Sequence, residues 1–344
     1  MKPEHGGNLR QLAALSGRPA REIPDFSANI NPLGPPEWLR SVVSRELETV
    51  VHYPDPDASS LAEALARRHA VARDEVIVGN GSSELLCALP RALGVSRAVI
   101  AVPSYIDYAK AARVAGLEVE TFALAESAGF NLDLVALGSV LRGQELVFLG
   151  QPNNPTGLLF DPGAFRHLAE SNPSTIFVVD EAFADFVEGY ETLAHERPHN
   201  VVVVRSMTKF YAIPGIRLGY AVAAPDIINK AREMLPPWSV NALAQAIGEA
   251  ALDDDDYARR TRTFVADRRE RLIRALRQLP GLAVYPGRAN FLLVRIERKD
   301  FDGPRLADAL LQREGIAIRV CTNYDGLDQR FFRVAVRTEE ENNR

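Results

Sequence analysis

The sequence has few cysteines, no long apolar run and no excess of positive charge. Its only cysteines, Cys87 and Cys321, argue against a disulfide-stapled secreted protein. No apolar stretch approaches the ~20 residues that a membrane-spanning helix needs, and no signal peptide is recognisable. The formal net charge of −5 leaves no electrostatic footprint for nucleic acid. We therefore expect a cytoplasmic protein that binds neither nucleic acid nor membranes.

Metal-binding patterns and repeats are also missing. The six histidines show no metal-ligand spacing, so we predict no metal site. The acidic run at residues 253–256 is better explained as the solvated start of a helix, where the helix dipole tolerates acids. No internal repeat or low-complexity linker divides the chain.

The composition is that of an ordinary globular protein, with 47% hydrophobic and 25% charged residues. Short apolar strands alternate with helices as far as about residue 222, which predicts an α/β domain with a mostly parallel central sheet. A long helical region at 240–279, broken near 252–257, is followed by more strands and a helix, which indicates a smaller α+β domain. The predicted divisions are an N-terminal segment 1–34 packing on the small domain, a large domain 35–236 and a small C-terminal domain 237–344.

Polar side chains recur where the predicted strands end. Ligands of open α/β sheets bind at the carboxyl ends of strands. The residues at or just after such ends are Tyr105, Asn154, Asp180, Ser206 and Lys209. This clustering predicts a single ligand site at one edge of the sheet.

The stretch Val201–Tyr220 carries the most informative group. Lys209 follows a buried strand, with Ser206 before it and Arg217 after it. A lysine partly desolvated at the mouth of a sheet has a lowered pKa and can form a Schiff base, although a solvated loop would also carry such residues. Earlier, VIVGNGSSE predicts a strand, a glycine turn and a helix. The amides of residues 81–83 could cradle a phosphate there, and a plain turn is the alternative.

Three motifs together are more specific. PNNPTG at 152–157, DEAF at 180–183 and SMTK at 206–209 with Arg217 resemble the fold-type I pyridoxal-phosphate-dependent aminotransferase superfamily. The whole chain resembles its histidinol-phosphate aminotransferase-like branch. Within that branch, HGGN at 5–8, DFSANINPLG at 25–34 and YDGLDQRFFRVAVR at 324–337 are most similar to the threonine-phosphate decarboxylases of cobalamin biosynthesis. WSVNALA at 238–244 and YPGRANFLL at 285–293 add to this similarity.

The resemblance implies pyridoxal 5'-phosphate as cofactor and assigns roles to residues. Lys209 would hold the cofactor covalently, Asp180 would pair with its ring nitrogen, Asn154 would donate to its phenolic oxygen and Tyr105 would stack on the ring. The cofactor phosphate would contact Gly81, Ser82, Ser83, Ser206, Arg217 and, from the other subunit of a homodimer, Tyr53. The substrate would be held by His5, Gly6, Asn29, Asn154, Arg319 and Arg333.

The resemblance also predicts the reaction, which is decarboxylation of L-threonine O-3-phosphate to (R)-1-amino-2-propanol O-2-phosphate. Phe183 stands where aminotransferases usually have a tyrosine, and its ring cannot donate a hydrogen bond. The alternatives are a histidinol-phosphate-type aminotransferase, a decarboxylase of phosphoserine and a non-catalytic cofactor-binding protein. Relatives usually end in a further helix, which we expect to be missing from the polar tail TEEENNR.

Overall fold

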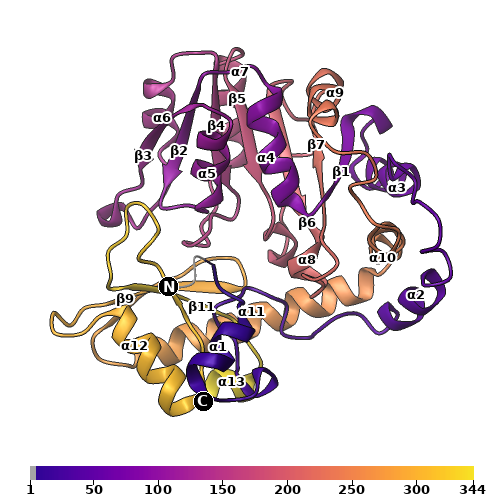
Figure 1. Ribbon diagram of the computed structural model, residues 1–344. Helices are drawn as coiled ribbons and strands as arrows, with labels where there is room; N and C mark the ends of the chain where they lie inside the picture. Colours follow the sequence, from indigo (N-terminus) through magenta and orange to yellow (C-terminus); the bar gives the residue numbers. More distant parts are fainter. Residues whose placement is uncertain (1–4) are drawn as a thin grey trace.

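The computed structural model describes residues 5–344, and its larger part is built on a seven-stranded sheet (Figure 1). The strand order is β1-β7-β6-β5-β4-β2-β3. The strands are β1 Val76–Asn80, β2 Arg97–Val102, β3 Glu118–Ala123, β4 Glu145–Gly150, β5 Ile176–Asp180, β6 Val201–Ser206 and β7 Leu218–Val222. Only β7 runs antiparallel to its neighbours, which confirms the predicted mostly parallel sheet.

Helices cover both faces of this sheet. One face packs against α4 (Ser82–Ala92), α5 (Asp107–Val114) and α9 (Pro225–Glu233). The other packs against α3 (Ser59–His69), α6 (Leu134–Val140), α7 (Pro162–Ser171) and α10 (Ala242–Leu252). Residues 201–204 of β6 are all fully buried because their side chains point alternately into these two cores. This double covering explains why the strands read as continuous apolar runs.

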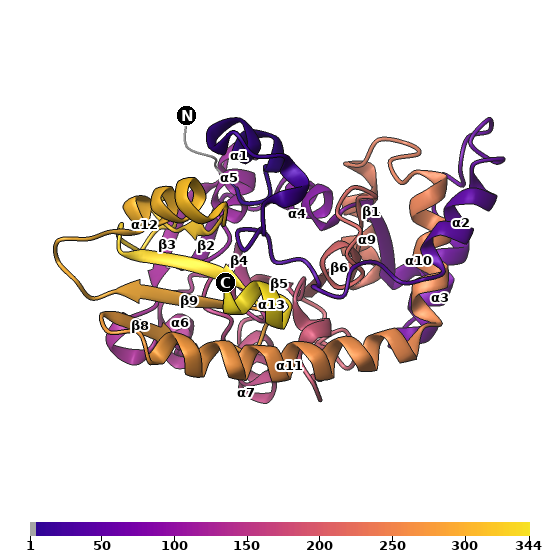
Figure 2. The same cartoon turned by 90° about the horizontal axis from the view of Figure 1, so that it is seen from below.

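The second sheet is antiparallel and has the order β10-β11-β9-β8. Its strands are β8 Leu282–Tyr285, β9 Phe291–Ile296, β10 Arg319–Val320 and β11 Phe331–Ala335. Helix α12 (Gly303–Ala309) continues as a π-helical turn, Leu310–Glu314, on one side of it. The 23-residue helix α11 (Asp255–Arg277) runs along both parts of the molecule (Figure 2). It begins where the break was predicted, and Asp254 of the acidic run caps it through the amide of Tyr257.

The N-terminal segment connects the two sheets. It contains α1 (Leu9–Ser16) and a 3-10 turn, Ala20–Glu22. Phe26 then hydrogen-bonds through its backbone to Ala317 and Ala335, which places the segment against the smaller sheet. A few residues later, the side-chain amide of Asn31 donates to the Phe210 carbonyl beside the end of β6. The next helix, α2 (Leu39–Glu46), lies against α10.

The polar C-terminal tail differs from the prediction because it contains a short helix, α13 (Glu339–Asn343). Thr338 and Glu341 form a reciprocal capping box at its start, which satisfies the first free amides. None of the helices within residues 5–344 combines the length and apolar character needed to cross a membrane.

Candidate active site

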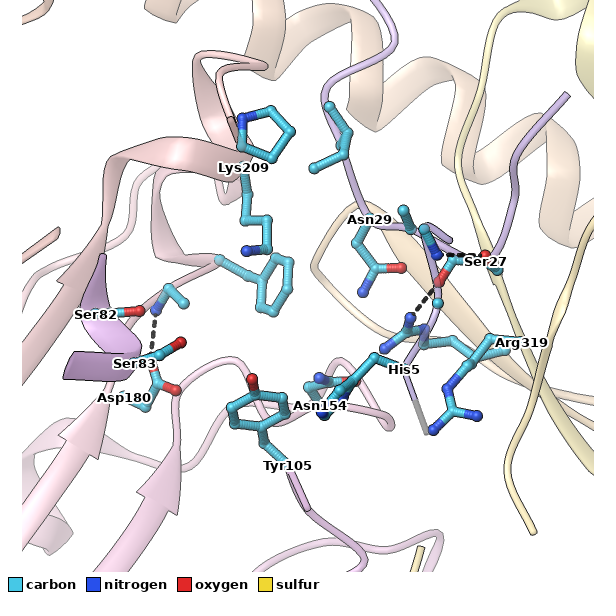
Figure 3. Close-up of a pocket in the computed structure, with 18 of the residues that line it drawn as sticks. His5, Ser27, Asn29, Ser82, Ser83, Tyr105, Asn154, Asp180, Lys209 and Arg319 are labelled. Atoms are coloured by element: carbon cyan, nitrogen blue, oxygen red, sulfur yellow. Dashed lines mark hydrogen bonds between the residues drawn. The ribbon is translucent and has the colours of Figure 1, made fainter. Parts of the chain in front are cut away.

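A cavity of about 390 Å³ lies at the carboxyl end of the large sheet, between that sheet, the N-terminal segment and the small sheet (Figure 3). Eleven of the predicted site residues line it. They are His5, Gly6, Asn29, Ser82, Ser83, Tyr105, Asn154, Asp180, Lys209, Arg319 and Arg333. Residues from positions 5 to 333 of the chain therefore converge on one cavity, and four of the five residues placed at strand ends, Tyr105, Asn154, Asp180 and Lys209, are among them.

Lys209 projects into this cavity from α8 (Met207–Phe210), directly after β6 (Figure 3). Its Nζ lies 3.3 Å from the hydroxyl oxygen of Thr208. Burial, together with the positive charges of Arg217 and Arg333, lowers the pKa of Lys209 to about 8, although Asp180 opposes the shift. The amine is thus far closer to its neutral, nucleophilic form at physiological pH than an ordinary lysine.

Asp180 ends β5 on the same side of the cavity and is only 7% exposed. Its Oδ2 accepts a hydrogen bond of 2.8 Å from the Tyr108 hydroxyl, and its Oδ1 accepts one of 3.0 Å from the Ala182 amide. Burial raises the pKa of Asp180, whereas these two donors and the charge of Lys209 act against that rise. A carboxylate buried in this way is stabilised by any cation that enters the cavity.

The N-terminus of α4, which carries Ser82 and Ser83, lies next to the guanidinium group of Arg217. Gly81 precedes the helix with φ +77°, and a side chain there would occupy the position of the Arg217 guanidinium. Arg217 donates to the Pro214 carbonyl, and no carboxylate within residues 5–344 forms an ion pair with it. Ser206 ends β6, three residues before Lys209, and its Oγ is 2.9 Å from Thr208 Oγ1. Free helix amides and a guanidinium together form a typical phosphate-binding arrangement.

Two buried arginines form the opposite wall. Arg319 of β10 and Arg333 of β11 are 6% and 5% exposed and occupy directly paired positions of the small sheet. Arg333 donates to Asn154 Oδ1 at 2.6 Å and to the Ser27 carbonyl at 2.7 Å, and no carboxylate in the described chain pairs with it. Arg319 donates to the Val320 carbonyl and to Asn323 Oδ1. Like charges placed opposite each other repel, so an anion between them would relieve the repulsion.

The N-terminal segment closes the same end of the cavity. His5 Nε2 lies 3.4 Å from Asp107 Oδ1 of α5. A side chain at Gly6 would collide with the Ser27 carbonyl, so glycine permits this close approach. The side-chain oxygen of Asn29 is buried and has no hydrogen-bond partner within residues 5–344. An unpartnered buried acceptor beside two arginines is consistent with a ligand that carries its own donor.

Several residues of this site were not predicted from the sequence. Ser27, Asp107, Tyr108 and Tyr324 all line or adjoin the cavity. Tyr108 could have been found, because it follows Tyr105 by three residues at the start of a helix and must lie near it.

Phe183 lies at the cavity, whereas Tyr53 does not. Phe183 lines the cavity and packs edge-to-face on Phe291 with ring centroids 4.9 Å apart, so it adds no donor. Tyr53 lies outside the cavity, is 82% exposed, and rests its ring on Trp238 at 4.8 Å between centroids. The structure of one chain therefore does not bring Tyr53 to the site.

A family model described as Aminotransferase class I and II matches residues 21–344. The chain belongs to this family. It is 41% identical over 346 residues to the threonine-phosphate decarboxylase of Salmonella typhimurium, covering 99% of this chain and 94% of that protein. These matches confirm the family and the relationship that the motifs predicted.

The chain is also similar to a bifunctional protein and to a solved aminotransferase structure. The chain is 38% identical to the adenosylcobalamin biosynthesis bifunctional protein CobDQ of Leptospira interrogans, of which it spans 40%, with 99% of this chain covered. The crystal structure of the histidinol-phosphate aminotransferase from Clostridium acetobutylicum matches with a TM-score of 0.87 and 30% identity, covering 93% of this chain and 96% of that one. The structural match confirms the predicted aminotransferase-type fold.

Proposed function

We propose that this protein is a pyridoxal-phosphate-dependent decarboxylase of L-threonine O-3-phosphate, with (R)-1-amino-2-propanol O-2-phosphate as product. The observation that carries the proposal is a cavity with a reactive lysine and a buried carboxylate on one side and two buried arginines on the other. The 41% identity to a threonine-phosphate decarboxylase over almost both chains supports it. The linker of the cobalamin nucleotide loop would then be the fate of the product.

The residues present fit the cofactor. The α4 N-terminus with Gly81, Ser82 and Ser83, together with Ser206 and Arg217, would hold its phosphate. Asp180 would pair with the ring nitrogen, and the buried, otherwise costly carboxylate supports this role. Asn154 uses its oxygen to accept from Arg333, which leaves its amide nitrogen to donate to the phenolic oxygen. Tyr105 would stack on the ring.

The opposite wall fits a substrate with two anionic ends. Arg333, without a carboxylate partner in residues 5–344, would bind the α-carboxylate, as guanidinium groups do in two-point fashion. His5, Gly6, Asn29 and Arg319 would bind the distal phosphate. The buried, unpartnered oxygen of Asn29 supports a hydrogen bond from a substrate amine or a protonated phosphate oxygen.

Pyridoxal phosphate, when bound, supplies an electron sink for the bond that breaks at the substrate's α-carbon. The clamp formed by Arg319 and Arg333 would orient the substrate so that the bond to its carboxylate, and not the bond to its α-hydrogen, is the one that breaks. The bond from the α-carbon to the carboxyl carbon breaks, CO₂ leaves, and a proton replaces it. Lys209 Nζ, which its pKa of about 8 leaves mostly protonated at neutral pH, would donate that proton to the α-carbon.

The test is to supply the purified holoenzyme with L-threonine O-3-phosphate and no keto acid. We expect stoichiometric CO₂ and amine, with the cofactor recovered as the aldehyde. Conversion of the cofactor to pyridoxamine phosphate without CO₂, reversed by a keto acid, would falsify the proposal and favour a histidinol-phosphate-type aminotransferase. A parallel reaction with O-phosphoserine, followed by mass spectrometry, separates the two candidate decarboxylase substrates.

We also propose that two copies form a homodimer with shared sites. Tyr53 packs on Trp238, both rings are exposed, and the exposed apolar side chains of Leu47, Val50 and Val51 precede Tyr53 in the chain, so a second copy would cover apolar surface there. Tyr53 of one copy would then reach the cofactor phosphate of the other. Mixed dimers of Tyr53→Phe and Lys209→Ala chains should regain activity, because one of their two sites is intact. A fully active monomer by sedimentation at assay concentration would contradict this arrangement.

A further inference from the structure

Tyr108 is a buried tyrosine in the first turn of α5 and is only 2% exposed. Its hydroxyl donates to Asp180 Oδ2 at 2.8 Å. Its ring stacks on Phe148, with centroids 5.2 Å apart and an interplanar angle of 8°, and meets the Tyr105 ring edge-on at 5.5 Å. Packing on two sides therefore fixes the direction in which the hydroxyl points.

We propose that Tyr108 is a positioning residue that keeps Asp180 ionised and oriented toward the ring nitrogen of pyridoxal phosphate. This inference rests on the proposed function. Tyr108 would act through Asp180, so neither the substrate nor the reacting bond needs to touch it. The contact with the Tyr105 ring would also tie the carboxylate to the surface on which the cofactor stacks.

The charges and donors around Asp180 give the physical reason. Lys209 attracts its negative charge, and Glu181, the residue directly after β5, repels it. Tyr105 also faces this carboxylate from the cavity side. Among these groups and the backbone, only the Tyr108 hydroxyl and the Ala182 amide donate hydrogen bonds to it within residues 5–344. Donors to the charged form favour that form, so loss of the Tyr108 hydroxyl removes one of two such stabilising contacts.

Loss of the Tyr108 hydroxyl should change both the protonation and the orientation of Asp180. Without the Tyr108 hydroxyl, the pKa of Asp180 rises further, because burial is then opposed by fewer donors. A protonated Asp180 could no longer keep the cofactor's ring nitrogen protonated, and a carboxyl group with one free oxygen could rotate away from it. Cofactor affinity should fall, and the acid limb of the bound cofactor's absorbance should move to higher pH.

The chain offers a matched control in Tyr190. Its hydroxyl also donates at 2.8 Å to a buried carboxylate, that of Glu181, the residue adjacent to Asp180. Glu181 points away from the cavity and pairs with Arg205. Tyr190→Phe thus deletes the same atom from a hydrogen bond of the same length, but to a carboxylate that does not line the cavity.

The experiment measures the affinity of apo-protein for pyridoxal phosphate by absorbance titration, in wild type, Tyr108→Phe and Tyr190→Phe, each with and without Asp180→Asn. We expect Tyr108→Phe to weaken affinity by roughly tenfold and to shift the acid limb upward by about one pH unit. Tyr190→Phe should change affinity by less than about twofold. In the Asp180→Asn background the effect of Tyr108→Phe should vanish, which is the signature of one residue acting through another.

Equal effects of the two tyrosine variants, or an undiminished effect of Tyr108→Phe beside Asp180→Asn, would overturn the inference and leave Tyr108 a packing residue. Failure of the wild type to bind pyridoxal phosphate would instead overturn the proposed function. If Tyr108→Phe does not fold, 3-fluorotyrosine at position 108 replaces it, because its more acidic hydroxyl is a stronger donor. The acid limb should then move to lower pH, and an unmoved or raised limb would contradict the inference.

Discussion

The buried arginine at the amino end of the central sheet is paired with acids, whereas two arginines beside the cavity at the carboxyl end lack carboxylate partners within residues 5–344. At the amino end, Arg97 of β2 lies directly opposite Glu145 of β4, and both are buried and paired. Glu145 also accepts from Thr175 and from two backbone amides, while Arg97 reaches Glu120 as well. At the cavity, the buried Arg333 of the small sheet and the partly exposed Arg217 have no carboxylate partner within residues 5–344, and Asp180 is the only acid there that offsets Lys209.

This difference separates charges that stabilise the fold from charges that await a ligand. A buried charge without a partner destabilises the folded state. We therefore expect such a charge where a bound molecule supplies the missing partner. Arg97 and Arg333 are similarly buried, at 7% and 5% exposed, so the contrast between these two arginines does not arise from a difference in burial. The charge distribution of the cavity therefore favours an anionic ligand, consistent with the phosphates and carboxylate of the proposed cofactor and substrate.

The largest expected effect comes from removing the reactive group of the carboxyl end. Lys209→Ala should abolish covalent attachment of the cofactor and reduce decarboxylation by about 10⁴-fold, since it removes both an anchor and a proton carrier. Borohydride reduction of the holoenzyme followed by peptide mass spectrometry checks the assignment. Lys230→Ala, on helix α9, serves as the control and should keep both properties. Attachment of the cofactor to another lysine in the wild type would refute the role of Lys209.

The next effect concerns stability and tests the comparison directly. Arg97→Met leaves Glu145 buried without its partner and should lower the free energy of unfolding by roughly 3–5 kcal/mol. Arg333→Met removes two hydrogen bonds. It also removes a buried charge that has no acid partner, and the free energy gained by removing that charge offsets the loss of the bonds. We expect its unfolding free energy to change by less than about 1 kcal/mol, although substrate binding is lost. Urea unfolding of the apo-proteins measures both.

A similar destabilisation by Arg333→Met would mean that this arginine stabilises the fold as Arg97 does. Arg333 and Arg97 would then have the same role, and the contrast between the amino end of the central sheet and the cavity would not hold for Arg333. A stable Arg333→Met protein that still processed the substrate normally would instead remove the arginine from the proposed carboxylate site.

Arg319→Ala should have a somewhat smaller effect, confined to catalysis. Loss of one charged anchor of the substrate should cost roughly 2–5 kcal/mol of transition-state binding, by analogy with truncating one partner of a buried charge pair. The looser substrate should also undergo some transamination, because the choice of the broken bond depends on how it is held. Steady-state rates of CO₂ release and the appearance of pyridoxamine phosphate measure the two effects. An unchanged rate would exclude Arg319 from the phosphate site.

Much of this site was predictable from sequence because the informative residues sit at strand ends. Lys209 and Asp180 each follow a run of buried β-branched or apolar residues, and parallel strands bring such ends together. Motifs then added His5 and the arginines from distant parts of the chain. Hydrogen bonds between elements were not predictable, and the bond from Tyr108 to Asp180 depends on how α5 packs on the sheet. Strand β8 was also missed, because its four half-buried residues carry little signal.

The smallest expected effect is a shift in the pH dependence of cofactor attachment. Only the neutral amine of Lys209 attacks an aldehyde, so the rate of covalent attachment to apo-protein should rise about tenfold per pH unit and level off near pH 8, where the pKa of Lys209 lies. The negative charge of Asp180 favours the protonated amine, so Asp180→Asn should move the midpoint to lower pH. The positive charge of Arg333 disfavours it, so Arg333→Met should move the midpoint to higher pH. Stopped-flow absorbance across pH 6 to 11 would measure these shifts, each expected to be about one unit or less. Shifts of the opposite sign, or a wild-type midpoint near that of an ordinary lysine, would show that the excess positive charge at the carboxyl end does not act on Lys209.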